Sequence, residues 1–285
     1  MKNIAILTGG DSSEYDISIK SAYTIKKHLS RKLFKGYIIC LRENEFSVID
    51  SQNEYIINKD FTLSLKDELI TFDAVFMALH GSPAENGLIQ PYFDKLKIPY
   101  TSCDGFVSSL VFDKYRCNKK LNTFNFRCPE SLLYHKGETI DHNTIINKMK
   151  LPFFVKPNSA GSSLGISKVK KKSDLFNAIN YALKHDQKVI IQKFIDGTEI
   201  SVGVYNNDNI IEALPITEII TDNEFFDYQA KYEGKAQEIT PAQISNELKE
   251  EIKKTTINIY KKMGLRGICR IDYIINKDNA FVIEI

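Results

Sequence analysis

The sequence predicts an α/β fold at its start and an α+β fold behind it. Over the first hundred residues, short apolar runs alternate with amphipathic stretches, and strands joined by helices at this spacing pair in parallel. In the last third, long strands follow one another with few helices between them, which is typical of antiparallel sheets. We expect domain boundaries near residues 100 and 190, which divides the chain into 1–100, 101–190 and 191–285.

Composition limits the class of protein. Lys and Arg number 38 and Asp and Glu 36, so the formal charge is +2. A balance so close to neutral argues against nucleic acid or a membrane surface as partner, and 43% hydrophobic residues excludes a disordered chain. The five cysteines include no C-x-x-C pair, and the first residues lack the features of a signal peptide. We therefore expect buried free thiols and a cytoplasmic protein.

Periodicity and turn residues place the elements of the first hundred residues. The apolar run over 3–8 ends in Gly9-Gly10, which indicates a buried strand that enters a loop. Between 16 and 29, small and apolar residues recur at helical spacing and form one stripe. The predicted elements are strands 3–8, 36–41, 74–79 and 98–100 and helices 16–29 and 88–96.

The rest of the chain is predicted in the same way. Asp104 is a suitable N-cap for a helical stretch that continues over 113–121. The further predicted elements are strands 152–157, 166–169, 188–194, 199–205 and 210–217, helices 173–183 and 245–262, a polar loop over 222–243, and a hairpin of strands 267–275 and 280–285.

A glycine–serine loop follows a lysine in the middle of the chain. Lys156 leads into Gly161-Ser162-Ser163-Leu164-Gly165. Backbone N–H groups and serine hydroxyls in such a loop can bind phosphates, and a preceding lysine supplies a positive charge. The loop is neither a Walker loop nor a dinucleotide fingerprint, because the required spacing is absent. The alternative is an ordinary Gly/Ser hairpin turn.

The last hairpin carries two carboxylates and an arginine. Arg270 and Asp272 share a strand face, and Glu284 lies twelve residues beyond Asp272. The two acids stand directly opposite each other if the turn has an odd number of residues centred on Asp278. Paired carboxylates of this kind suit Mg²⁺ held together with substrate phosphates. The alternative is a pair of solvated surface charges, which the apolar neighbours disfavour.

A third set of candidate binding residues lies in the sequence between the glycine–serine loop and the last hairpin. The backbone edge around Gln192, Lys193 and Ile195 can hydrogen-bond an adenine, and Glu199 can hold ribose hydroxyls. The alternative is a plain sheet strand followed by a solvated glutamate.

Two polar loops end strands of the first domain, and ligands bind at the carboxyl ends of strands in open α/β sheets. Glu14, in the loop after the first strand, can pair with an ammonium group. His80 begins the second loop, although a capping or core histidine is the alternative. Gly9-Gly10 does not indicate a dehydrogenase, because the G-x-G-x-x-G spacing is absent.

Taken in chain order, the motifs described above resemble those of D-alanine–D-alanine ligases, which are members of the ATP-grasp superfamily. The resemblance runs from Asn3 to Ile285. The resemblance implies an N-terminal α/β domain followed by two α+β subdomains that clamp ATP. It also implies ligation of two D-alanines through an acyl phosphate, for peptidoglycan precursors, and often a homodimer. The matching stretches are ILTGGDSSEYDISIKS, FMALHGSPAENGLIQ, VFDK, FFVKPNSAGSSLGISKV, VIIQKFIDGTEISVGV, FFDYQAKY, ITPA, GICRIDYI and FVIEI.

The resemblance assigns the nucleotide and metal contacts. It implies phosphate ligands at Lys114, Lys156 and Lys231, a phosphate flap at Ser162, Ser163 and Leu164, an adenine edge at Gln192, Lys193 and Ile195, a ribose contact at Glu199, Mg²⁺ or Mn²⁺ ligands at Asp272 and Glu284, and an oxyanion contact at Arg270.

The resemblance also assigns the first substrate. It places Glu14 at the ammonium and His80 near the carboxylate. Ser162 and Tyr232 join Glu14 in closing the polar loop over the site, which excludes water from an acyl phosphate. A tyrosine at 232 implies the dipeptide product, because related depsipeptide-forming ligases tend to carry a histidine there.

One departure from the family pattern affects the expected activity. The sequence stops at Ile285, whereas the family continues as E-x-N-T-x-P-G with a further metal ligand and the second-substrate site. We therefore expect a fragment or a shortened product with impaired ligation. The alternatives are a ligase for another D-amino acid or D-hydroxy acid, and a non-catalytic nucleotide-binding remnant.

Overall fold

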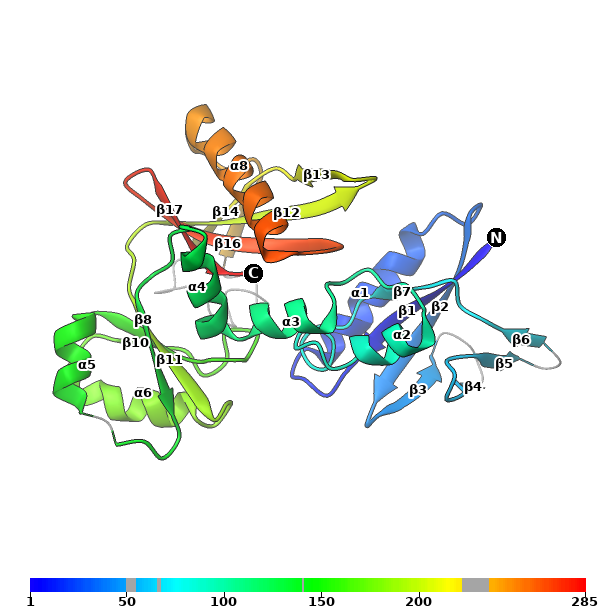
Figure 1. The fold of residues 1–285 in the computed structure, drawn as a ribbon, viewed down its shortest axis with the longest axis horizontal. Coiled ribbons are helices and arrows are strands. Elements are labelled where there is room, and N and C mark those ends of the chain that lie inside the picture. Colours follow the sequence, from blue (N-terminus) through cyan, green and yellow to red (C-terminus); the bar gives the residue numbers. More distant parts are fainter. Residues whose placement is uncertain (50–54, 66–67, 140, 222–235) are drawn as a thin grey trace. The chain divides into compact units, whose positions relative to one another are not determined.

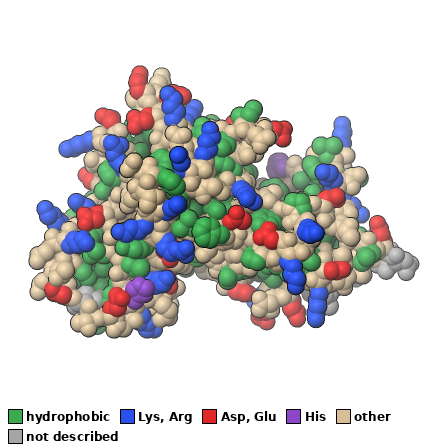
Figure 2. All heavy atoms as spheres, viewed as in Figure 1, with side chains coloured by type: hydrophobic (Ala, Val, Ile, Leu, Met, Phe, Trp, Pro, Cys, Tyr) green, Lys and Arg blue, Asp and Glu red, His purple; other side chains and the backbone are tan. Residues whose placement is uncertain are grey.

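The computed structural model describes residues 1–49, 55–65, 68–139, 141–221 and 236–285 (Figure 1). The chain forms two compact units, Met1–Ser109 and Leu110–Ile285. The division expected near residue 190 lies inside the second unit and stays a prediction. On the face shown in Figure 2, side chains of both charges are interspersed, in keeping with the formal charge of +2.

The first unit is built on a five-stranded sheet in the order β4-β3-β2-β1-β7. The central strand β1 pairs in parallel with both β2 and β7, which confirms the predicted parallel core. The strands are β1 (Lys2–Gly9), β2 (Phe34–Arg42), β3 (Glu45–Val48), β4 (Tyr55–Ile56) and β7 (Ala74–Met77), and the helices are α1 (Tyr15–His28) and α2 (Gln90–Leu96).

The central strand is apolar throughout because both of its faces are covered. Ile4 and Ile6 pack with Ala22 of α1 on one face. Ala5 and Leu7 pack on the other face, in a cluster rich in aromatic rings. A strand buried on both sides reads as a continuous apolar run rather than an alternating one, which is why the sequence revealed it so clearly.

Two expectations for this unit are corrected. The strand expected over 98–100 is a single bridge between Tyr100 and Val75, because residues 98–100 extend the sheet by only that one pair. The antiparallel strands β3, β4, β5 (Leu63–Leu65) and β6 (Glu68–Ile70) were not expected. They are two to four residues long, too short for a clear periodic pattern.

A helical stretch that the sequence predicted as one piece begins in the first unit and continues into the second. Instead, α3 (Gly105–Phe112) ends before Asp113, and α4 (Lys114–Thr123) starts after it. Asp113 has an extended backbone, and its side chain accepts a hydrogen bond from the N–H of Arg116 at 2.9 Å. Asp113 is therefore the N-cap of a new helix, which fixes where Lys114 lies.

An antiparallel sheet in the order β10-β9-β11-β8 follows. Its core joins the sheet to α5 and α6. The helix expected over 173–183 begins as a short 3₁₀ turn, Lys172–Asp174, before α6. The elements are β8 (Ser131–His135), α5 (His142–Met149), β9 (Phe153–Pro157), β10 (Ser167–Val169), α6 (Leu175–Ala182) and β11 (Lys188–Lys193).

The last sheet has the order β15-β14-β12-β16-β17, with β13 paired to β12. The hydroxyl of Thr256 on α8 lies 2.8 Å from that of the fully buried Tyr273 on β16, so the helix covers this sheet. The elements are β12 (Thr198–Asn207), β13 (Ile210–Ala213), β14 (Thr217–Thr221), β15 (Ala236–Ile239), α8 (Asn246–Met263), β16 (Ile268–Asn276) and β17 (Asn279–Glu284).

Two expectations in this sheet are also corrected. The strand expected over 210–217 is two strands, since β13 and β14 pair with different parts of β12. The polar loop expected over 222–243 includes strand β15, which pairs with β14. Residues 222–235 lie outside the described part of the chain.

Candidate active site

The carboxyl ends of β1 and β7 carry the two polar loops of the first unit. Gly9 ends β1 with a φ of +92°, and a Cβ there would lie 2.4 Å from the carbonyl oxygen of Leu41. Only glycine allows so close a passage between neighbouring strands. Glu14 follows at the start of α1 and is 8% exposed, so its carboxylate belongs to an enclosed edge rather than to open solvent.

Serine hydroxyls join the two loops. Ser18 Oγ accepts a hydrogen bond from the backbone N–H of His80 at 2.9 Å and donates to the carbonyl of Glu14 at 3.1 Å. Ser12 Oγ donates to the carbonyl of His80 at 3.0 Å and accepts from the N–H of Glu14 at 3.2 Å. Ser21 Oγ lies 3.0 Å from Nε2 of the His80 ring. The fold thus brings together Glu14 and His80, which the sequence placed in separate loops.

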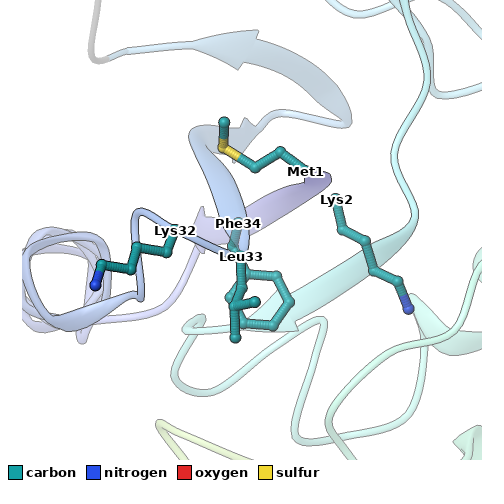
Figure 3. Close-up of a pocket in the computed structure, with 5 residues that line it drawn as sticks. All are labelled: Met1, Lys2, Lys32, Leu33 and Phe34. Atoms are coloured by element: carbon teal, nitrogen blue, oxygen red, sulfur yellow. The ribbon is translucent and has the colours of Figure 1, made fainter.

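A shallow hollow lies at the other edge of this sheet (Figure 3). Its volume is about 350 Å³. It is lined by Met1, Lys2, Lys32, Leu33 and Phe34, at the amino ends of β1 and β2. Ligands of parallel sheets bind at the opposite, carboxyl edge. We therefore assign this hollow no part in the candidate site.

In the second unit, Lys114 connects three segments that are distant in sequence. Its Nζ donates a hydrogen bond to the carbonyl of Ala160 at 2.7 Å and lies 2.7 Å from Oε1 of Glu284. The lysine side chain is only 9% exposed, whereas that of Glu284 is 38% exposed. A largely buried ammonium therefore joins the start of α4, the glycine–serine loop and the last strand.

The base of the glycine–serine loop is firmly held. The carbonyl and Oδ1 of Asn158 accept hydrogen bonds from the backbone N–H groups of Lys114, at 3.1 Å, and Tyr115, at 3.0 Å. The N–H of Ser159 donates to Oδ2 of Asp186 at 2.7 Å. The sequence indicated neither Asn158 nor Asp186. Because Asn158 is fully buried with its polar atoms bonded, it fixes the loop against α4.

The tip of the loop has an unusual backbone. Ser162 and Ser163 have φ values of +55° and +57°, in the left-handed region that costs energy for residues other than glycine. Gly165 follows at +73°. The loop joins β9 and β10, which pair antiparallel, so it is a hairpin connection as the alternative interpretation held. Its role as a phosphate flap, with Leu164 at its end, stays a prediction.

Lys156 on β9 contacts Gln192, a diagonal neighbour on the adjacent strand β11 whose register partner is Phe154. Its Nζ donates to Oε1 of Gln192 at 2.9 Å. Gln192 is 3% exposed, and its Oε1 keeps a second lone pair that can accept from another donor, such as an amino group. The fold therefore joins a predicted phosphate ligand directly to a predicted adenine contact.

The other predicted nucleotide contacts are placed as follows. The backbone N–H of Lys193 donates to the carbonyl of Glu130 at 2.9 Å, so the carbonyl oxygen is the backbone group of Lys193 left to contact an adenine. Ile195 is partly buried beyond the end of β11. Glu199 lies on β12, also partly buried, between Ile219 and Ile274 of the adjacent strands. Lys231 and Tyr232 fall outside the described residues.

Asp272 and Glu284 are register partners across β16 and β17, as the sequence suggested. The reason differs from the expected one. The turn has two residues, Lys277 and Asp278, both with positive φ, and it is not centred on Asp278. A β-bulge between Asp272 and Tyr273 shifts the register by one residue and restores the pairing.

Each of these carboxylates already contacts a cation. Arg270 donates from Nε and Nη2 to the two oxygens of Asp272, both at 3.0 Å. Ser201 Oγ also donates to Asp272 Oδ1, at 2.8 Å. Glu284 has Lys114 as its partner. The mutual repulsion that paired acids would experience is thus relieved, and the interpretation as solvated surface charges is wrong for Asp272, whose side chain is 15% exposed.

The donor set fits a divalent cation that shares its ligands with a substrate. Asp272 and Glu284 offer oxygen ligands, which Mg²⁺ prefers. Over the described residues, no cluster of three or more acidic, His or Cys side chains could hold a metal alone. Mg²⁺ often binds through one or two carboxylates and completes its shell with water and phosphate oxygens.

The cysteines are free thiols over the described chain, and three of the five are buried. Cys128 and Cys269 are partly exposed, which corrects the expectation that all five are buried. Cys117 lies one turn after Lys114 on α4. Burial raises the pKa of the Cys117 thiol to about 12, so this thiol is neutral beside the charged groups.

The fold and these two constellations define an enzyme class. An N-terminal parallel α/β unit precedes two antiparallel sheets, one with the lysine and the glycine–serine loop and the other with paired carboxylates. This is the ATP-grasp fold, which the solved ligases described next share.

Two family models match the chain. The model for the D-Ala-D-Ala ligase N-terminus matches residues 3–103, and that for the C-terminus matches residues 120–285. The D-alanine–D-alanine ligase of Flavobacterium johnsoniae is 44% identical, and the match covers 100% of this chain and 88% of that protein. The chain therefore belongs to the D-alanine–D-alanine ligase family.

Solved structures of ligases have the same fold as this chain. The VanG D-Ala:D-Ser ligase from Enterococcus faecalis superposes with a TM-score of 0.87 at 29% identity, over 99% of this chain and 89% of that chain. The D-alanine–D-alanine ligase from Bacillus anthracis gives 0.81 at 29% identity, over 100% and 86%. Among the described helices, none is both long and apolar enough to cross a membrane.

Proposed function

We propose that this protein joins two D-alanines to D-alanyl-D-alanine at the expense of ATP, for peptidoglycan precursors. Family membership supports the reaction. The observation that carries the proposal to this chain is the ion pair of Lys114 with Glu284, at the base of the glycine–serine loop. This ion pair brings the ammonium of Lys114 next to the glycine–serine loop and to the carboxylate of Glu284. The loop is of a kind that binds phosphates, and the carboxylate is of a kind that binds Mg²⁺.

The phosphates of ATP are assigned to the second unit. Lys114 and Lys156 bind them as positive charges, and the loop formed by Ser162, Ser163 and Leu164 covers them. Each lysine now contacts an acceptor of its own chain, Glu284 for Lys114 and Gln192 for Lys156. A triphosphate provides stronger acceptors than a neutral amide, so we expect Lys156 to exchange its partner when ATP binds.

Asp272 and Glu284 would hold Mg²⁺ or Mn²⁺, which would supply positive charge against the phosphates of ATP. Arg270 holds Asp272 through two hydrogen bonds, and its side chain is 65% exposed. That exposure leaves it able to contact a transferred phosphate. Lys231 and Tyr232 keep their family roles as predictions.

The reaction has two steps. A carboxylate oxygen of the first D-alanine attacks the γ-phosphorus, the bond to the bridging oxygen breaks, and ADP leaves. The free amine of the second D-alanine then attacks the acyl carbon, and the bond to the phosphate oxygen breaks. The amine loses one proton as the peptide bond forms, and the leaving phosphate takes it up as hydrogen phosphate. Glu14 holds the ammonium of the first D-alanine, and His80 lies near its carboxylate. These two residues orient the first substrate, because the serine hydroxyls fix their backbones.

The test is D-alanine-dependent release of ADP, with isolation of D-alanyl-D-alanine. The Flavobacterium johnsoniae relative serves as the positive control for the assay. Dipeptide formation by this chain supports the proposal. ATP consumption without dipeptide, under conditions where the relative makes it, contradicts the proposal.

A second candidate has a specific observation behind it. The VanG structure is that of a D-Ala:D-Ser ligase and resembles this chain closely in fold. The discriminating experiment offers D-alanine with an equal concentration of D-serine or D-lactate and identifies the product by mass. Preferential incorporation of D-serine or D-lactate would move the proposal to another ligase of the same fold. A cytoplasmic location, which the cysteines and the first residues indicate, and a homodimer, which the family resemblance implies, both stay predictions.

A further inference from the structure

Three serines between residues 12 and 21 form hydrogen bonds with His80. Its backbone N–H and carbonyl are both bonded, by Ser18 and Ser12 respectively. Its remaining freedom is therefore rotation of the side chain. Ser21 Oγ then lies 3.0 Å from the ring atom Nε2. Ser18 and Ser21 are both on α1, so one helix holds the backbone of His80 and contacts its ring.

The contact with Ser21 selects one of two ring orientations. A rotation of the imidazole by 180° about its bond to Cβ would place a carbon where Nε2 now lies, and the hydrogen bond would be lost. With Nε2 committed to Ser21, Nδ1 is the atom through which the ring acts on other polar groups. Which atom carries the proton then depends on whether the hydroxyl donates or accepts.

The surroundings favour a hydroxyl that donates. A Cβ at Gly81 would lie 3.5 Å from Oε2 of Glu14, so a carboxylate is at this edge of the sheet. The carboxylate of a bound amino acid would be a second one. Ionised carboxylates only accept hydrogen bonds, so a ring that meets either of them needs a donor at Nδ1. In a neutral imidazole, this requires Nε2 to be the acceptor.

We propose that Ser21 is a positioning residue for His80: its hydroxyl donates to Nε2, places the proton of the neutral ring on Nδ1 and so presents an N–H to the carboxylate of the first D-alanine. The second half of this inference rests on the proposed function, whereas the ring orientation does not. Ser21 makes no contact with the reacting atoms in this role.

The experiment measures the ring itself. The protein is labelled with ¹⁵N-histidine, which marks only five residues, and the His80 signals are identified by their loss in His80→Gln. We expect the wild-type ring to be protonated at Nδ1 in its neutral form. Ser21→Ala should give a mixture of the two tautomers, and Ser21→Thr, which keeps a hydroxyl, should restore the Nδ1-protonated form.

D-alanine affinity is measured on the same samples from the shift of these signals. Loss of one neutral hydrogen bond predicts roughly three- to tenfold weaker binding for Ser21→Ala, with recovery in Ser21→Thr. Thr24→Ala is the matched control, because Thr24 is on the same helix and donates to the Lys20 carbonyl instead, at 2.9 Å. It should match the wild type in both readouts.

Two results would overturn the proposal: a wild-type ring protonated at Nε2, or a Ser21→Ala protein with unchanged tautomer and affinity. A third result separates the two halves of the proposal: Ser21→Ala changes the tautomer, but D-alanine shifts no histidine signal of the wild-type protein. In that case, Ser21 does position the ring, but the ring does not contact the carboxylate of the first D-alanine. The ADP-release assay then decides independently whether the proposed function itself fails.

Discussion

The polar edge of the first unit and the charged cluster of the second unit are held by different kinds of bond. At the polar edge, neutral serine hydroxyls bond the backbones of Glu14 and His80. In the charged cluster, Lys114 and Arg270 pair with Glu284 and Asp272. The first arrangement fixes the backbones of Glu14 and His80 through neutral donors and acceptors, whereas the second pairs charged groups of the kind that can meet phosphates and a metal.

This difference sets the scale of the expected effects. A neutral hydrogen bond contributes about 0.5–1.5 kcal/mol, and a hydrogen bond to a charged group about 1.5–3 kcal/mol. A charge left partly buried without its partner costs more than the pair contributed. Substitutions in the charged cluster should therefore change both stability and chemistry, and those at the polar edge should change mainly the placement of the first substrate.

The largest effect is expected for Asp272→Asn, which removes the negative charge of a proposed metal ligand and one of the two oxygens that accept hydrogen bonds from Arg270. We expect the rate of dipeptide formation to fall on the order of 100-fold and the required Mg²⁺ concentration to rise. The measurement is ADP release as a function of Mg²⁺ concentration.

The matched control for this variant is Glu212→Gln, a carboxylate of the same sheet that accepts a hydrogen bond from Tyr205 at 2.9 Å. It should leave the Mg²⁺ dependence as in the wild type. Equal Mg²⁺ profiles for wild type and Asp272→Asn would remove Asp272 from the metal site.

Next is Lys114→Met, which leaves Glu284 without its ammonium partner and the Ala160 carbonyl without a donor. Because Glu284 is partly exposed, we expect the free energy of unfolding to fall by about 1–3 kcal/mol rather than by the full cost of a buried charge. ATP affinity should fall roughly tenfold or more. Urea unfolding and calorimetric titration with an ATP analogue measure the two quantities.

Lys253→Met is the control, since Lys253 pairs with Glu250 on the surface of α8 at 3.5 Å. Surface pairs of this kind contribute about 0.5 kcal/mol or less. If both lysine variants lose the same small amount of stability and bind the ATP analogue as the wild type does, the charged cluster is not the nucleotide site.

A smaller effect is expected for Ser18→Ala in the first unit. The N–H of His80 loses its acceptor, and the carbonyl of Glu14 loses one of its donors, at a fully buried position. We expect a loss of about 1–2 kcal/mol in unfolding free energy. The KM for the first D-alanine should rise more than kcat falls. A change in ATP affinity without a change in D-alanine KM would contradict the separation of roles between the two regions.

The smallest effect concerns the thiols of the second unit. Burial raises the pKa of Cys117 and of Cys128 to about 12 from a usual value of 9.0. At pH 8, Cys117 should therefore resist alkylation in the folded protein and react in urea, as mass spectrometry can detect. Cys128, which is partly exposed, should react faster than Cys117 in the folded protein. Rapid alkylation of Cys117 in the folded protein would contradict its burial.

The same shifts predict the pH dependence of stability. Below about pH 9 the thiols are protonated in both the folded and unfolded states, so their contribution is fully present. Between about pH 9 and 12 only the unfolded state releases these protons, and the free energy of unfolding should fall. Urea unfolding of wild type and Cys117→Ala across this range measures the slope, which should be shallower in the variant.

Much of the fold could be predicted from local signals. The apolar run that predicts a strand over 3–8 is β1, which is buried on both faces, and the helix predicted over 245–262 is α8, which Ser245 caps and Gly264 ends. The short strands β3 to β6 were missed, since two to four residues carry no periodic signal. The break at Asp113 was missed because an aspartate in an apolar helical pattern does not reveal whether it caps a new helix.

The candidate site, like the fold, could be predicted only in part from the sequence. In the glycine–serine loop and in the last hairpin, the residue types and their spacing are enough to indicate phosphate and metal chemistry. The supporting residues did not stand out: Asn158 and Ser201 are ordinary polar residues whose partners lie 43 and 71 positions away. Only the strand register, which pairs Ser201 with Asp272, reveals such a contact.

The sequence by itself determined the order of the elements, the family and the chemical groups available, because these depend on composition and spacing along the chain. The tertiary structure alone decided which of these groups touch. A β-bulge placed Glu284 opposite Asp272, and the cap at Asp113 set Lys114 between Ala160 and Glu284. Contacts between segments so distant in sequence depend on register and packing, which no local pattern records.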